Sequence, residues 1–257
     1  MKNRVNPFPL ADLWCLHGFL GLPEDWRGVF PLGFRFHAPA WLPLLTGLPG
    51  EGPVLDVLAD CLNQLAADTR TTPGRRALLG YSMGGRIALR MLLQAPKAWD
   101  CAILVSTHPG LGDAREREPR LKNDREWARR FRHDPWATLI RDWNAQPVFS
   151  KDQDTLGVSR AESAFLRSEL ALALERGSLA FDEDCRPGLC GLDRPILWVA
   201  GANDVRYQAL AVECLALNSH FELAILPDAG HRVPWTPKVP FTETVMRFLN
   251  FPMSTTG

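Results

Sequence analysis

The sequence predicts one α/β domain in which helices flank a mostly parallel β-sheet and an inserted helical cap covers it. Short apolar runs alternate with helix-length segments over the first hundred residues, as βαβ units require. The alternation stops at about residue 107 and resumes at about residue 191. A length of 257 residues suits one large core with a single excursion from it.

The first hundred residues are expected to supply four strands and two helices. The strands are predicted at Asp12–Leu16, Phe34–His37, Arg76–Leu79 and Cys101–Val105. The helices are predicted at about Val54–Asp68 and Met83–Gln94. The second helix should end near Gln94 because Pro96 cannot continue it.

The middle of the chain changes character, since apolar β-like runs disappear and Arg, Glu, Trp and helix-forming residues become frequent. Cap helices are predicted at Glu116–Arg132, Pro135–Asn144 and Ser159–Arg176. After the cap come a strand over Pro195–Gly201, a helix near Tyr207–Leu217, a strand over Phe221–Leu226 and a helix near Thr242–Asn250. The prediction is therefore a single domain over residues 1–257 with a cap at about 107–191.

Charge and cysteine content exclude several function classes. Lys plus Arg equals Asp plus Glu at 29 each, so no net field favours nucleic acid or an anionic membrane. The amino-terminal region resembles neither a signal peptide nor a membrane span, and a cytoplasmic location is expected. The six cysteines lack metal-binding spacing, so reduced structural thiols and no metal site are expected.

The stretch LLGYSMGGRIAL carries the strongest signal for chemistry. It runs from a predicted strand through Gly-x-Ser-x-Gly into a predicted helix, the context of the nucleophile elbow in the α/β-hydrolase fold. Gly80 and Gly84 are needed because side chains beside so tight a turn would collide with neighbouring backbone. Ser82 is therefore the predicted catalytic serine.

An elbow serine needs a histidine and an orienting carboxylate, which in this fold follow it in the order Asp or Glu, then His. Asp204 and His231 come after the two last predicted strands, where ligands meet parallel sheets. Asp193 precedes its strand, and Asp228 is too near His231 in sequence to orient its ring. The predicted triad is Ser82, Asp204 and His231.

The predicted oxyanion hole pairs the backbone N–H of Met83 with that of Phe19 in the loop LHGFLG. His17 in this loop is expected to shape it by hydrogen bonding.

Arg86 follows Ser82 by one helical turn, so it is predicted either to reach solvent or to hold a substrate carboxylate. Tryptophans in the cap, at 127, 136 and 143, are expected chiefly as core anchors.

Several strings beyond the elbow resemble a known family. They are LHGFLG, LLGYSMGGR, HPGL, Arg120 followed by NDREWARRF, DW with QPVF, LRS, GANDVRYQALA and AGH. Together they resemble the α/β-hydrolase-fold synthases of 2-succinyl-6-hydroxy-2,4-cyclohexadiene-1-carboxylate (SHCHC), enzymes of menaquinone biosynthesis. The resemblance extends over most of the chain and assigns no role to Asn144 or Arg206.

The resemblance implies a lyase that eliminates pyruvate without an acyl-enzyme. It implies that His231 deprotonates Ser82, whose alkoxide takes a ring proton while the amides of Phe19 and Met83 stabilise the charge. The substrate would be a small polycarboxylate, and no metal or organic cofactor is implied. The substrate-binding residues that the resemblance implies are Arg86, Arg120 and Arg167, with Tyr81 and Trp143 beside the pocket.

Two other functions are also compatible with these residues. A carboxylesterase or carbon–carbon bond hydrolase would use the same triad. A non-catalytic small-molecule receptor would retain the pocket without turnover. Removal of Arg86 or Arg120 discriminates the first, because an esterase for neutral substrates tolerates it; ligand binding without turnover identifies the second.

Overall fold

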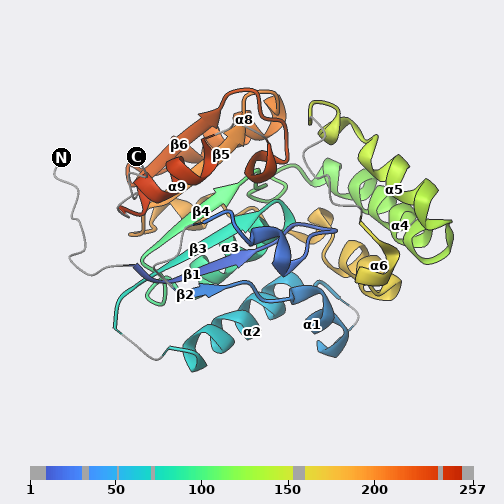
Figure 1. Cartoon of the computed structure of the whole chain (residues 1–257), viewed down its shortest axis with the longest axis horizontal. Coiled ribbons are helices and arrows are strands. Elements are labelled where there is room, and N and C mark those ends of the chain that lie inside the picture. The colour runs from blue at the N-terminus through green and yellow to red at the C-terminus, as the bar shows by residue number, and fades with distance from the viewer. Residues whose placement is uncertain are drawn as a thin grey trace.

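The computed structural model describes residues 10–30, 35–50, 52–70, 73–152, 160–236 and 240–250. Within these ranges six strands form one sheet in the order β2-β1-β3-β4-β5-β6 (Figure 1). Every neighbouring pair in the sheet is parallel. The strands are β1 (Leu10–Leu16), β2 (Arg35–His37), β3 (Arg75–Tyr81), β4 (Cys101–Val105), β5 (Ile196–Gly201) and β6 (Phe221–Leu226).

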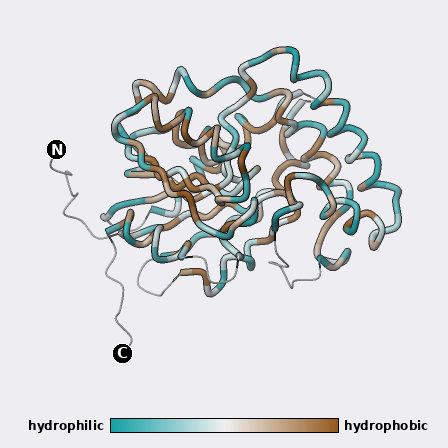
Figure 2. The backbone as a smooth tube through the Cα atoms, turned by 90° about the horizontal axis from the view of Figure 1, so that it is seen from above, coloured by the Kyte–Doolittle hydropathy of each residue, from teal (hydrophilic) through white to brown (hydrophobic). Residues whose placement is uncertain are grey.

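Alternation along the strands divides the apolar side chains between two cores, one on each face of the sheet. Trp14 and Leu78 lie in the core on one face, whereas Leu13 and Leu79 lie in the core on the other. The helices α1 (Trp41–Gly47), α2 (Leu55–Asp68), α3 (Met83–Gln94) and α8 (Val205–Leu215) contribute to the first core, and α9 (Phe241–Phe248) contributes to the second. Figure 2 shows the apolar segments gathered at the centre of the molecule.

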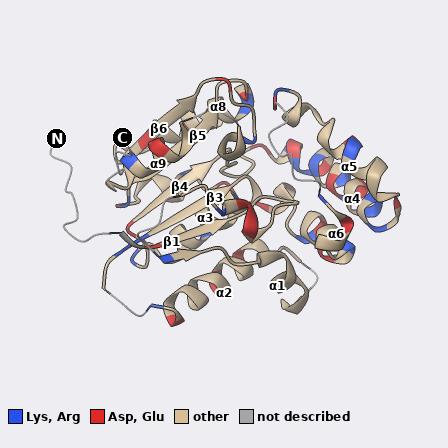
Figure 3. Cartoon of the chain, viewed as in Figure 1, with Lys and Arg blue, Asp and Glu red and all other residues tan. Residues whose placement is uncertain are grey.

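The cap lies between β4 and β5 and packs as a layer of helices beside the sheet (Figure 1). Its helices are α4 (Arg117–His133), α5 (Trp136–Asn144), α6 (Arg167–Arg176) and α7 (Arg186–Cys190). Charged side chains are dense on α4, α5 and α6, while the strands carry few (Figure 3). The apolar faces of the cap join the first core through residues such as Phe131, Leu139 and Leu170.

Most predicted elements match the structure within two residues, and the exceptions have local causes. The helix expected over Ser159–Arg176 begins only at Arg167, because Phe165 and Leu166 are extended. The ring of Phe165 packs on Trp136, with ring centroids 6.0 Å apart, which holds this segment against α5. Phe34 and Ser159 lie outside the described residues. The short helices α1 and α7 were not predicted.

Candidate active site

The elbow is built where β3 ends and α3 begins. Ser82 has φ 52° and ψ −113°, a strained conformation for a residue with a side chain. A Cβ on Gly80 would lie 2.4 Å from the carbonyl oxygen of Gly84, and one on Gly84 would lie 2.3 Å from that of Leu16. The turn therefore requires glycine at both positions.

The structure brings Ser82, His231 and Asp204 together in one hydrogen-bonded row. The Nε2 atom of His231 lies 3.1 Å from the Ser82 Oγ, and its Nδ1 lies 2.7 Å from the Asp204 Oδ2. His231 and Asp204 are buried. With Nδ1–H donated to the carboxylate, Nε2 can accept the serine proton, and the carboxylate stabilises the imidazolium that results.

Two residues that the sequence analysis missed fix the histidine loop. Ser106, with φ 46°, donates its hydroxyl to the His231 carbonyl oxygen at 2.9 Å. The Oδ1 atom of Asp152 accepts from the backbone N–H of Arg232 at 3.0 Å. Burial raises the pKa of Asp152. Both contacts hold the main chain at or beside His231, and such contacts cannot be predicted from the spacing of residues in the sequence.

The backbone groups predicted for the oxyanion hole border the same cavity. Phe19 and Met83 both line it, and neither backbone N–H has a hydrogen-bond acceptor among the residues described. The His17 ring lies behind this loop, where its Nδ1 donates to the Gly18 carbonyl oxygen at 2.9 Å. Burial lowers the His17 pKa to about 4, so the ring is neutral and shapes the loop.

A cavity of about 580 Å³ opens above Ser82 and His231, between the sheet edge and the cap. Aromatic walls come from Phe19, Trp127 and Trp143, and the ring of Trp143 contacts those of the other two. Trp127 and Trp143 thus anchor the cap core and face the cavity as well. The cations that line the cavity are Arg86, Arg120, Lys151 and Arg206.

Arg86 lines the cavity but is paired within the protein. Its Nε donates to the Asp182 Oδ2 at 2.5 Å and its Nη2 to the Gly177 carbonyl oxygen at 2.7 Å. The remaining nitrogen, Nη1, has no acceptor in the described part of the chain. Although burial opposes the charge, the Asp182 carboxylate raises the pKa of Arg86. Arg86 is therefore buried and held by protein groups, and only its Nη1 is left to donate to a ligand.

Arg120 is a second cavity cation with an internal partner. Its Nε donates to the Asp124 Oδ2 at 2.8 Å, and the Ser178 hydroxyl donates to the same oxygen at 2.7 Å. About a third of the Arg120 side chain is exposed, against 3% of Asp124. The remaining donors of Arg120 are thus accessible from the cavity.

Two predicted substrate-binding residues lie elsewhere. Arg167 does not line the cavity: it donates to Glu162 at 2.6 Å and to the carbonyl oxygens of Phe131 and Asp134, tying α6 to α4. Tyr81 is buried behind the triad, with its ring centroid 5.6 Å from that of His231. Neither side chain lines the cavity, because the cap fold directs Arg167 away from it and the end of β3 places Tyr81 behind the triad.

Three ionisable residues for which no role was predicted from the sequence affect the charge of the cavity. Asp124 and Asp182 neutralise the two cavity arginines. His108 lines the cavity, and burial, followed by the guanidinium groups of nearby arginines, lowers its pKa to about 3. Its Nδ1 accepts from the Gly110 backbone N–H, so the neutral ring carries its proton on Nε2.

The described ranges contain neither a cluster of metal-binding side chains nor a membrane-spanning helix. No group of three or more His, Cys, Asp or Glu side chains there is arranged to hold a metal ion. All six cysteines are free thiols. No helix in those ranges combines the length and the apolar character needed to span a bilayer.

Residues 15–243 match the model of the alpha/beta hydrolase family. Similar proteins include 2-succinyl-6-hydroxy-2,4-cyclohexadiene-1-carboxylate synthases from three bacteria. The protein of Klebsiella pneumoniae (strain 342) is 37% identical over 90% of each chain. Those of Serratia proteamaculans and Pectobacterium atrosepticum are 32% and 34% identical, over 92% and 94% of each chain.

Solved structures share the fold. The structure of MenH from S. aureus superposes with a TM-score of 0.79 at 21% identity and covers 95% of both chains. The enol-lactonase from Burkholderia xenovorans LB400 superposes with a TM-score of 0.71 at 18% identity, over 94% of this chain and 92% of its own. Both likenesses concern the arrangement of the backbone.

Proposed function

Because this chain belongs to the alpha/beta hydrolase family and, within it, to the SHCHC synthases, we propose that it is a lyase of menaquinone biosynthesis. It releases pyruvate from 2-succinyl-5-enolpyruvyl-6-hydroxy-3-cyclohexene-1-carboxylate and yields SHCHC. The substrate is a small polycarboxylate.

The charges around the catalytic serine of this chain support the proposal. The hydrogen-bonded Ser82 and His231 lie in a cavity whose lining includes the cations of Arg86, Arg120 and Arg206. Guanidinium groups suit carboxylates because their N–H donors match the two oxygens in geometry. An esterase for neutral esters has no need of these charges beside its serine.

The first step is removal of a ring proton from the substrate. His231 accepts the hydroxyl proton of Ser82 on Nε2, and the Asp204 carboxylate stabilises the imidazolium. The Ser82 alkoxide then takes the ring proton. The C–H electron pair moves into the ring and onto the succinyl carbonyl oxygen, where the N–H groups of Phe19 and Met83 stabilise the enolate.

The second step expels the enolpyruvyl group. The enolate electrons form a double bond between ring carbons 2 and 3, the existing double bond moves from carbons 3 and 4 to carbons 4 and 5, and the bond from carbon 5 to the enolpyruvyl oxygen breaks. The leaving enolpyruvate gains one proton and becomes pyruvate, so the proton lost from the ring is balanced. Ser82 forms no covalent bond to the substrate in this scheme, and water is not a reactant.

The proposal is tested by comparing two reactions of the purified protein. We expect the menaquinone intermediate to give pyruvate, measured by coupling to lactate dehydrogenase, and p-nitrophenyl acetate to be hydrolysed poorly. The reason is that the cationic lining favours a polyanion and the scheme needs no water. Rapid hydrolysis of the ester with no pyruvate formed would instead assign the triad to an esterase.

A further inference from the structure

We propose that Arg206, with the Nε2–H of His108 as a second donor, forms a carboxylate-binding subsite of the active-site cavity. This inference rests on the proposed function for the identity of the ligand, a carboxylate of the substrate. The sequence motifs assigned no role to Arg206, and the structure places it on the first turn of α8, directly after Asp204 and Val205.

The cations that line the cavity differ in whether a carboxylate of the protein is paired with them. Arg86 is paired with Asp182, and Arg120 with Asp124. Arg206 has neither an ion pair nor a hydrogen bond to any residue in the described ranges, although it lines the cavity. Lys151 also reaches the cavity, from a loop that continues into residues outside those ranges. A carboxylate gains most from a guanidinium whose donors are still unoccupied.

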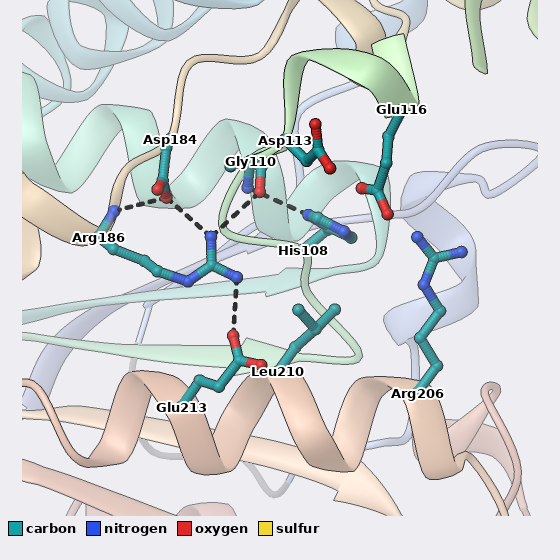
Figure 4. Close-up of a pocket in the computed structure, with 10 residues that line it drawn as sticks. His108, Gly110, Asp113, Glu116, Asp184, Arg186, Arg206, Leu210 and Glu213 are labelled. Carbon is teal, nitrogen blue, oxygen red and sulfur yellow. Dashed lines mark hydrogen bonds and ion pairs between the residues drawn. The ribbon is translucent and has the colours of Figure 1, made fainter. Parts of the chain in front are cut away.

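Arg206 lies at the boundary between two cavities. His108 and Arg206 line both the cavity above Ser82 and a second one of about 440 Å³. Figure 4 shows that the His108 ring nitrogen farther from Gly110, Nε2, is turned toward the Arg206 guanidinium. Because Nδ1 accepts from Gly110, the nitrogen facing Arg206 carries a hydrogen. Two donors therefore face each other, an arrangement that an anion between them would satisfy.

The electrostatics agree with an anion at this place. Burial, and then the nearby charge of Arg206, lowers the pKa of His108. The side chains of Arg86, Arg120 and Arg186 act in the same direction, so the ring lies in a strongly positive field. That field attracts a carboxylate, whose binding would in turn raise the pKa of His108.

The lining of the second cavity places the ligand on the active-site side. Its acidic residues are Asp113, Glu116, Asp184 and Glu213. Arg186 pairs with Asp184 and Glu213 there, at 2.8 and 2.9 Å (Figure 4). Glu116 points toward Arg206 but forms no ion pair with it. The second cavity is lined by four carboxylates and two arginines, whereas the Ser82 cavity is lined by four cations and two carboxylates, so an anion is favoured on the Ser82 side.

The subsite is tested by the kinetics of pyruvate release. We expect Arg206→Gln to raise KM for the menaquinone intermediate at least about tenfold, the effect of one charged hydrogen bond, while kcat changes less than about threefold. Arg206→Lys should recover most of the loss because it retains the charge. Lys97→Gln, which removes an exposed cation outside both cavities, should leave both constants unchanged.

Glu116→Gln separates the subsite from a structural role. If Arg206 instead serves Glu116, both Arg206→Gln and Glu116→Gln will lower the melting temperature and neither will raise KM; that result overturns the proposal. If Arg206 binds substrate, Glu116→Gln leaves KM unchanged or lowers it, because a competing carboxylate has been removed.

Calorimetric titration with tricarballylate, a three-carboxylate probe, distinguishes failure of the subsite from failure of the proposed function. Weaker binding to Arg206→Gln by about tenfold or more supports the subsite even if the wild type releases no pyruvate. An active wild type whose KM and tricarballylate affinity are both insensitive to Arg206→Gln overturns the subsite alone. A wild type that neither binds tricarballylate nor releases pyruvate overturns both.

Discussion

Asp182 is the residue that makes an arginine possible one turn after the catalytic serine. It accepts from Arg86 through Oδ2 and pairs with Arg90 through Oδ1 at 2.9 Å, with 3% of its side chain exposed. A cation in the first turn of α3 meets the positive end of the helix dipole, and burial adds to the cost. Because the partner carboxylate comes from the cap, 96 residues along the chain, local sequence could not predict it.

This pairing changes how substitutions of the arginines should be interpreted. Loss of Arg86 leaves Asp182 facing only Arg90 inside the protein, so a fall in activity would mix destabilisation with weaker substrate binding. Loss of Arg120 likewise leaves the buried Asp124 carboxylate with only the Ser178 hydroxyl as a partner. The activity of either variant should therefore be compared with its free energy of unfolding.

The sequence predicts the place of a site residue best where that place follows from the backbone, and least where the direction of a side chain decides it. Ser82 and His231 follow from the elbow pattern and from the end of a strand, and the structure brings them into contact. Arg167 and Tyr81 were placed by resemblance, yet their side chains lie away from the cavity. Spacing along the cap does not encode direction, which depends on contacts such as that of Arg167 with Glu162.

His17 and His108 should make the protein less stable in mild acid. Their pKa values in the folded state are lowered to about 4 and about 3, from an ordinary value of 6.5. Below pH 6.5 the unfolded chain therefore binds protons that the folded chain does not, and stability falls as the pH falls. Each histidine should cost about 2 kcal/mol between pH 7 and pH 5, measured by urea unfolding.

His108→Asn is the matched variant for this measurement. The asparagine side-chain oxygen can accept the Gly110 N–H in place of Nδ1, while the titrating ring is lost. The variant should lose about 2 kcal/mol less than the wild type on going from pH 7 to pH 5. An equal acid loss in both proteins would show that His108 is not held neutral by its surroundings.

At the scale of elements, the elbow and the oxyanion loop depend on one close approach. A Cβ on Gly84 in α3 would lie 2.3 Å from the Leu16 carbonyl oxygen and 2.4 Å from that of His17. Those carbonyls belong to the end of β1 and the loop that carries Phe19. The glycine thus sets the distance between the two amides of the oxyanion hole, since Met83 starts the same helix.

Gly84→Ala should therefore damage both stability and catalysis. The clash would push the loop after β1 away from α3, and we expect the free energy of unfolding to fall by about 3 kcal/mol. Displacing one oxyanion donor should reduce pyruvate release about a hundredfold.

Gly47→Ala serves as the control for that substitution. An added Cβ at this exposed end of α1 meets nothing within 4 Å, so the change should lie within about 1 kcal/mol and leave turnover intact. Chemical unfolding and the coupled pyruvate assay measure both variants. Wild-type turnover in a folded Gly84→Ala protein would contradict the proposed geometry of the oxyanion hole.

Element boundaries were predicted well where the apolar pattern is long and poorly where tertiary contacts decide. Met83–Gln94 was predicted at the bounds that α3 has in the structure. The helix α1 has only seven residues and contains Pro43, and α7 has five, so neither is long enough for a repeated apolar pattern to be recognised. The start of α6 depends on aromatic packing against α5.

At the scale of the molecule, the parallel sheet and the cap have separate tasks. The sheet brings the ends of β1, β3, β5 and β6 to one edge, which places the oxyanion loop and the triad together. The cap supplies Arg120, the cavity tryptophans and the carboxylates that hold Arg86 and Arg120. The sheet was predictable from apolar alternation, whereas the packing of the cap over it rests on contacts between distant residues.

The most direct test of the account is pyruvate release by the wild type and by Ser82→Ala at saturating menaquinone intermediate. If Ser82 is the base that takes the ring proton, its loss should lower kcat at least about a thousandfold. The cationic cavity remains, so the variant should still bind the intermediate, with a rise in melting temperature. Pyruvate release by Ser82→Ala within tenfold of the wild-type rate would contradict the account.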